Sequence, residues 1–87
     1  MIFVGLAKFR KPPDKRDIGD TAKMLANWKE KGINILNWYW TLGRFDAVTV
    51  FEAKSEKEAM KMAIGISEWV KTETLVAIPR EEAINFV

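Results

Sequence analysis

Residues 38–46 have the sequence WYWTLGRFD, and this stretch says more about the fold than any other part of the chain. Three adjacent large rings are typical of a β-strand, and they predict a strand that is buried on both faces. Gly43 follows at a point where a tight turn needs a positive φ angle, which glycine adopts without steric cost. The stretch therefore predicts a strand, a turn and a second strand, and it indicates a fold before it indicates a reaction.

The sequence on both sides of this hairpin predicts two more strands and two helices. Apolar runs place the four strands at residues 2–7, 33–41, 45–53 and, beginning at 69 or 70, up to 78. Apolar residues recur at helical spacing from Ile18 to a closing Gly32, and again after Ser55, so both helices are expected to pack an apolar face inward. Ser55 and Glu58 are spaced as a capping box, in which each side chain bonds the backbone amide of the other. The tail, residues 80–87, is short and amphipathic, and we expect it to dock on the domain or on a neighbouring molecule.

The order of elements is β-α-β-β-α-β, the split pattern of ferredoxin-like folds in the α+β class. Right-handed connections place the first and third strands at the centre of a four-stranded antiparallel sheet, flanked by the fourth and the second. Two helices cover only one face of this sheet, yet residues 2–7 and 47–51 are apolar at both even and odd positions. We therefore expect a second copy of the chain to cover the other face, in an isologous homodimer or a higher even-numbered oligomer.

A chain of 87 residues with 48% hydrophobic content is expected to form one domain, residues 1–87, around a single core. It has no histidine and no cysteine, which argues against Ser-His-Asp and Cys-His nucleophiles, zinc sites and disulfides. The carboxylates lack the loop spacing of a calcium site, so neither a metal nor another cofactor is expected. The sequence shows no signal peptide and no apolar run long enough to span a membrane, so we expect a cytoplasmic protein. The absence of glutamine beside abundant lysine and glutamate resembles the composition of thermophile proteins.

Residues 39–46, YWTLGRFD, resemble the signature of the GYD-domain family, with Phe45 at the place of the tyrosine. The similarity extends to the first strand with Leu6 and Lys8, to residues 51–53 and to residues 72–75, and it covers nearly the whole chain. The resemblance implies a dimeric α/β barrel of the ferredoxin-like group, which agrees with the expected pairing of two sheets. It implies no particular activity, because the family is one of uncharacterised function.

Asp46 is the candidate catalytic residue. A carboxylate between Phe45 and the apolar Ala47 is partly desolvated and is therefore able to act as a base. The simpler interpretation, which the sequence favours, is that Asp46 accepts hydrogen bonds from backbone amides or pairs with a cation. Arg44 is a candidate for holding an anionic ligand or for bridging to a partner subunit, or it is a solvated turn residue.

Trp38 and Trp40 point to one face of their strand and Tyr39 points to the other. We expect the two tryptophans to be interface residues that anchor the dimer core, in preference to forming the wall of an apolar pocket. The candidate ligand-binding residues are Tyr39, Trp40, Arg44 and Glu52. Glu52 would form a pocket carboxylate pair with Glu73. The simpler interpretation is that these residues lie at an exposed edge or pair with Lys8 or Lys71.

Many aromatic side chains without a nucleophile and base favour a homo-oligomeric module that binds a small apolar or weakly anionic molecule or serves as an accessory protein. The alternative is a cofactor-independent enzyme, an isomerase or a monooxygenase, by analogy with other dimeric α/β barrels. The sequence leaves open whether the protein is an enzyme. A nucleic-acid binder that uses the basic residues 8–16 is less favoured, because the net charge is only +2 and basic residues alternate with acidic ones.

Overall fold

The computed structural model describes all 87 residues and contains the predicted order of strands and helices. The elements, in chain order, are β1 (Ile2–Phe9), α1 (Lys15–Glu30), β2 (Asn34–Trp40), β3 (Ala47–Glu52), α2 (Glu56–Gly65), β4 (Val70–Ala77), the short α3 (Arg80–Ala83) and the 3₁₀ turn η1 (Ile84–Phe86). None of the helices combines the length and the apolar content that crossing a membrane requires.

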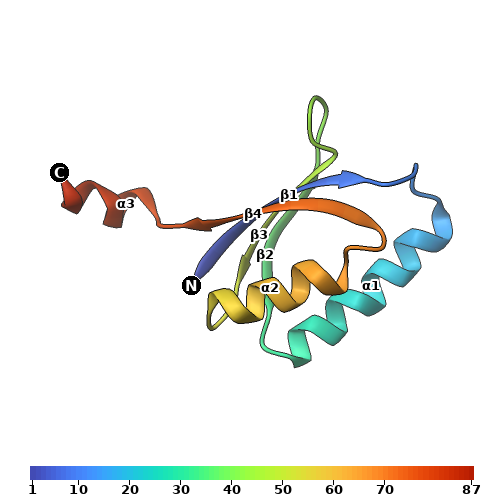
Figure 1. Cartoon of the computed structure of the whole chain (residues 1–87), viewed down its shortest axis with the longest axis horizontal. Coiled ribbons are helices and arrows are strands. Elements are labelled where there is room, and N and C mark those ends of the chain that lie inside the picture. The colour runs from blue at the N-terminus through green and yellow to red at the C-terminus, as the bar shows by residue number, and fades with distance from the viewer.

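The four strands form one antiparallel sheet in the order β2-β3-β1-β4, as predicted. The central strands are β1 and β3, and the edges are β2 and β4. Helices α1 and α2 lie on the same side of the sheet, and the other face carries no helix (Figure 1). The predicted α+β fold with ferredoxin-like topology is therefore confirmed.

The core is concentrated at one end of the helix-covered face. Phe3 of β1 and Phe51 of β3 are paired in register, and their rings stack with 5.3 Å between centroids. Both side chains are almost fully buried. Ile33, which precedes β2, and Ala59 and Met62 of α2 belong to the same cluster. Helix α2 therefore closes over the end of the sheet where bulky apolar side chains meet.

Helix α1 begins at Lys15 with a complete capping box. The Asp14 carboxylate accepts a hydrogen bond from the Asp17 amide at 3.0 Å, and the Asp17 carboxylate accepts one from the Asp14 amide at 2.8 Å. These two bonds satisfy backbone donors that a helix N-terminus leaves without partners. Gly32 follows the helix with φ 91°, in agreement with the predicted end of the helix.

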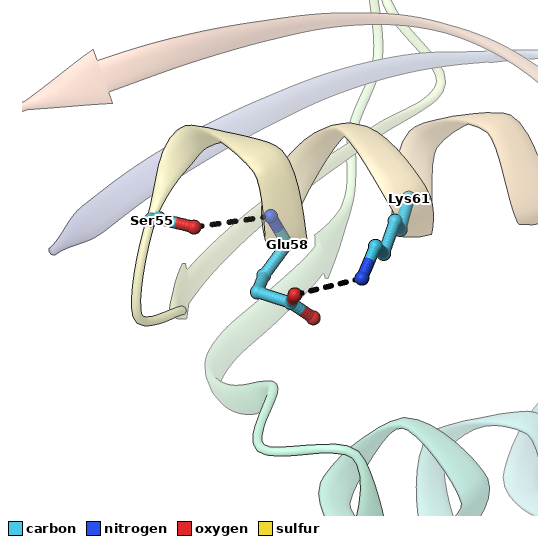
Figure 2. Close-up of polar contacts among 3 residues, drawn as sticks. All are labelled: Ser55, Glu58 and Lys61. Carbon is cyan, nitrogen blue, oxygen red and sulfur yellow. Dashed lines mark hydrogen bonds and ion pairs between the residues drawn. The ribbon is translucent and has the colours of Figure 1, made fainter.

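At α2 only half of the predicted capping box forms (Figure 2). Ser55 Oγ accepts a hydrogen bond from the Glu58 amide at 3.4 Å, as expected. The Glu58 carboxylate instead accepts a bond from Lys61 Nζ at 2.9 Å, one turn further along the helix. The ion pair directs this carboxylate away from the Ser55 amide, so the predicted return bond is missing.

Helix α1 packs less closely than its amphipathic pattern predicts. None of its residues is buried, and Ile18, which was expected on the inward face, is 58% exposed. Trp28, near the other end of the helix, packs against the core cluster. The prediction of an inward-packed apolar face is therefore wrong for the first half of α1, which stands off the sheet.

Strand β2 lies at an edge of the sheet, so its rings are not buried on both faces as predicted. Trp38, Tyr39 and Trp40 are 37%, 57% and 58% exposed. A register shift between Ile35 and Asn37 marks an irregularity in the pairing with β3. The rings remain in contact with solvent because β2 has a neighbouring strand on one side only and α1 stands off the sheet.

The face without helices is apolar at its centre. Side chains along β1 point alternately to the two faces of the sheet. Phe3 is buried on the helix-covered face, so Val4 and Leu6 point to the open face. Val4 is in register with Val50 and Leu75, and Leu6 is in register with Val48. This open face, defined by these five residues, is the surface that the sequence predicts to need a cover.

The C-terminal segment, α3 with η1, extends away from the sheet beyond the end of β4 (Figure 1). Its apolar side chains Ile84, Phe86 and Val87 are exposed. The segment does not dock on its own domain, which was one of the two expectations for it.

Candidate functional site

A cavity of about 300 Å³ lies between the helices and the covered face of the sheet. All four tryptophans of the chain line it, although they come from three separate parts of the sequence. Trp28 belongs to α1, Trp38 and Trp40 belong to β2, and Trp69 directly precedes β4. The largest side chains of the protein thus converge on one space.

The floor of the cavity is made of small side chains on the central strands. Along the covered face of β1 the residues change from Phe3 to Gly5 and then to Ala7. The β3 residues in register with Gly5 and Ala7 are Thr49 and Ala47. The ring of Phe3 fills the layer between sheet and helix, whereas the space above the smaller residues stays open. The cavity therefore follows from a change in side-chain size along two adjacent strands.

Gly5 makes room for the side chain of Thr49 in this floor. A Cβ atom at this position would lie 2.6 Å from Thr49 Oγ1, closer than non-bonded atoms approach. Glycine in a strand costs about 0.5–1 kcal/mol relative to alanine. The close approach that explains a glycine in this central strand is that of the Thr49 hydroxyl, which donates to the Gly5 carbonyl at 3.5 Å.

Close contacts hold two of the tryptophan rings. Trp28 lies over Gly65 of α2, where a Cβ atom would come within 2.7 Å of the indole. Lys31 Nζ lies 4.9 Å from the centroid of the same indole. Trp40 meets the ring of Phe9 edge to face, with centroids 5.4 Å apart. These contacts fix two walls of the cavity without filling the space between them.

Trp69 is held where the end of β1 meets the segment before β4. The Arg10 amide donates a hydrogen bond to the Trp69 carbonyl at 3.1 Å, and the Trp69 amide donates to the Ile66 carbonyl at 3.0 Å. Arg10 Nε donates to the Ser67 carbonyl at 2.7 Å. The backbone of Trp69 is therefore tied to both neighbouring elements.

The lining is mainly apolar, with hydroxyl groups in the floor and charges at the rim. Thr49, Thr72 and Thr74 lie beside Ala7 and Gly5 on the covered face. No charged side chain of the protein is buried. No group of three or more His, Cys, Asp or Glu side chains is placed to hold a metal ion. The lining suits a mainly apolar molecule that a few hydrogen bonds orient.

The strand register places Trp38 and Trp40 on the helix-covered face, opposite Thr49 and Ala47 of β3. They do not lie on the open face, which was expected to meet a second copy. The predicted role as anchors between stacked open faces does not fit this placement. Their alternative role, as the wall of an apolar pocket, fits the cavity that they line.

Asp46, the candidate catalytic carboxylate, connects the hairpin loop to the end of β1. Its Oδ2 accepts a hydrogen bond from the Phe9 amide at 2.8 Å. Its own amide donates to the Ala7 carbonyl at 2.8 Å, and its carbonyl accepts from the Thr41 amide at 2.8 Å. Asp46 is not among the residues that line the cavity. This geometry supports a structural role for Asp46 in preference to a role as a base.

The other candidate ligand-binding residues lie apart from one another. Tyr39 is on the open face, where its hydroxyl accepts a hydrogen bond from Asn37 Nδ2 at 3.4 Å. Glu52 is at the end of β3 on that same face, and Arg44 is exposed in the hairpin loop. Of the four candidate ligand-binding residues, Trp40 alone lines the cavity.

The sequence reasoning missed Trp28 and Trp69 as members of the site, and it missed the floor. A usable signal was present in β1, where alternate positions shrink from Phe3 to Gly5 and Ala7. Such a step beside bulky neighbours indicates a place where the layer between sheet and helices is not filled.

Comparison with known proteins identifies a family and a fold. The family model of the GYD domain matches residues 9–87. Among solved structures, LrpC of B. subtilis is similar over 91% of this chain and 51% of its own, with a TM-score of 0.70 and 18% sequence identity. This chain thus spans about half the length of LrpC, and the similarity concerns the fold alone. No curated protein matches the sequence.

Proposed function

This chain belongs to the GYD-domain family, and we propose that it is a homo-oligomeric module that binds one small, mainly apolar molecule in the cavity between its helices and its sheet. The observation that carries the proposal is the convergence of all four tryptophans on a space of about 300 Å³ above a floor of small residues. An unfilled apolar space is unfavourable, because the atoms that line it lose dispersion contacts. A ligand that fills the space restores those contacts.

The lining indicates the chemistry of this ligand. Indole rings offer flat apolar surfaces, which favour a planar or cyclic molecule over an extended chain. The hydroxyl groups of Thr49, Thr72 and Thr74 provide hydrogen bonds that orient it. The lining carries Arg10 and Lys11 together with the acidic Asp17, Asp20 and Glu68. A weakly anionic group of the ligand is therefore expected only beside Arg10 and Lys11, which are exposed to solvent.

We propose binding in preference to catalysis because of where the acidic groups lie. Asp46 is outside the cavity, and its carboxylate bonds the Phe9 amide at 2.8 Å. Asp17 does line the cavity, but its carboxylate caps α1 by accepting from the Asp14 amide at 2.8 Å. Asp20 and Glu68 also line the cavity, but both are exposed to solvent. The isomerase or monooxygenase considered from the sequence needs a group that moves a proton at the substrate, and no carboxylate of the cavity is buried beside its apolar floor to serve as one.

We further propose that the open face pairs with the same face of a second copy, giving a homodimer in the cytoplasm. A contiguous apolar patch on the central strands supports pairing, since such patches on soluble proteins mark interaction sites. A two-fold contact places the same patch on both sides. The absence of cysteine agrees with a cytoplasmic location, because small secreted domains commonly depend on disulfides.

The pairing is tested by introducing a charge at the centre of the open face. Val50→Glu would bury a carboxylate between the two sheets, at a cost of several kcal/mol. We expect sedimentation to show that this variant dissociates at concentrations where the unmodified protein is dimeric. Leu42→Glu, at the fully exposed tip of the hairpin loop, is the matched control and leaves the dimer intact. Two variants that remain equally dimeric would rule out the open face as the interface.

The binding proposal is tested with anilinonaphthalene sulfonate, a planar apolar probe that carries one anionic group. Its binding is followed by energy transfer from the tryptophans, which all line the cavity. Ala7→Leu adds bulk to the floor and is expected to weaken binding by at least about tenfold, which corresponds to about 1.4 kcal/mol. Ala26→Leu adds the same bulk at an exposed position of α1 and is expected to change nothing. Equal affinities in these two variants would exclude the cavity as the binding site.

A further inference from the structure

The C-terminal arm, residues 79–87, is an apolar segment without a partner on its own domain. It contains α3 and η1, which extend beyond the end of β4 and away from the sheet (Figure 1). Ile84, Phe86 and Val87 are 48%, 70% and 109% exposed. Large apolar side chains gathered on one short exposed segment indicate a surface that binds another surface.

A second unpartnered apolar surface is the side cleft, which lies between α1 and the edge strand β2. Ile18, Ala22 and Leu25 of α1 line it together with Trp38 and Trp40 of β2. The two tryptophans also line the ligand cavity, so the side cleft is a lateral opening of that cavity. It stays open because α1 stands off the sheet along its first half.

The arm of a chain points away from the side cleft of the same chain. It continues β4, whose last residue, Ala77, pairs with Ile2 at one end of the sheet. Trp40 pairs with Ala47, which pairs with Ala7 near the opposite end. Residues 2 and 7 of β1, which belong to these two sets of paired residues, are about 17 Å apart along the strand. The edge strands β2 and β4 are roughly 14 Å apart across the sheet. The arm would have to reverse its direction and cross the sheet to fill the cleft of its own chain.

We propose that the C-terminal arm of one copy docks in the side cleft of a second copy, with Phe86 seated against Trp38 and Trp40. The arm leaves the sheet at edge strand β4 and the cleft opens at edge strand β2. An arm at the edge of one molecule therefore reaches the cleft of another without passing over a helix. Two-fold symmetry makes the exchange reciprocal, so each cleft receives one arm and no open-ended assembly forms.

This exchange gives the second copy a part in the binding site. The arm of the partner covers the lateral opening beside Trp38 and Trp40, so each cavity is completed by the other subunit. Docking of the arm does not require a ligand, so the exchange is expected whether or not the cavity is occupied.

Cysteine crosslinking tests the exchange, because the chain has no cysteine of its own. Protein with Asn85→Cys, next to Phe86 on the arm, is mixed with isotopically labelled protein that carries Ala22→Cys in the side cleft, and the mixture is oxidised. A disulfide requires Cα atoms about 4.4–6.8 Å apart, so its formation reports close approach. In the control, Leu42→Cys at the exposed hairpin tip replaces Ala22→Cys. Mass spectrometry distinguishes mixed dimers from dimers of one variant.

We expect several-fold more mixed dimer with the Ala22→Cys partner than with the Leu42→Cys partner. Adding Phe86→Ser to the arm removes this difference, because the seated ring is lost; Phe86 is exposed, so its replacement leaves the fold intact. Equal yields with the two partners would overturn the proposal. So would a high yield that Phe86→Ser leaves unchanged, because the apolar contact would then not hold the arm.

Discussion

Replacing Ala7 by leucine places three additional carbons on the floor of the cavity, between Thr72 and Ala47 in the sheet. These atoms enter an apolar space of about 300 Å³ that is already open, so the neighbouring side chains keep their positions. Each methylene group moved from water into apolar surroundings contributes about 0.8 kcal/mol, and three contribute roughly 2.4 kcal/mol. Fixing the leucine side chain costs about 0.5–1 kcal/mol. We therefore expect Ala7→Leu to raise the free energy of unfolding by about 1.5 kcal/mol.

The assay is urea and thermal unfolding followed by circular dichroism. A gain of about 1.5 kcal/mol raises the melting temperature of a domain of this size by roughly 6–12 °C. The control Ala26→Leu changes stability by less than about 0.5 kcal/mol, because its added carbons stay in water. An Ala7→Leu protein that is less stable and binds anilinonaphthalene sulfonate normally would show that the space above Ala7 is already filled.

Gly65→Ala is expected to lower the free energy of unfolding by about 1–3 kcal/mol, because its Cβ would lie 2.7 Å from the Trp28 indole; a more stable protein in urea would contradict this contact. Asp46→Ala is expected to cost about 1 kcal/mol, because the Phe9 amide loses its acceptor at 2.8 Å. Probe affinity stays unchanged in that variant, and a loss of affinity would place Asp46 in the site after all. Asp14→Ala removes the N-cap of α1 and is expected to cost about 1 kcal/mol in thermal unfolding, and an unchanged melting temperature would show that α1 does not depend on its cap.

The fold was predictable because its elements depend on local patterns. Gly43 adopts φ 100°, and Gly32 adopts φ 91°, at the turn and helix end that their positions predict. Strand order followed from the handedness of the two helical connections. The absence of the reciprocal Glu58 bond was not predictable, because Lys61 offers a competing partner whose geometry depends on side-chain rotamers.

The candidate site was less predictable because periodicity describes one element at a time. Alternation along β2 correctly places Trp38 and Trp40 together, but it does not say which of the two faces the helices cover. The approach of Trp28 and Trp69 to those rings depends on how α1 and the segment before β4 sit over the sheet. An amphipathic pattern gives the direction of a helix face and not its distance from the sheet, so the exposure of Ile18 was not foreseen.

The ligand-sized apolar space among the four tryptophans can be detected in a crystal with xenon. Xenon occupies apolar cavities without specific hydrogen bonds. In a crystal of the protein pressurised with xenon, we predict a xenon atom above Gly5, surrounded by the indole rings that line the cavity. A crystal structure in which those rings pack directly onto Gly5 and Ala7, with no xenon between them, would show that the protein has no such space.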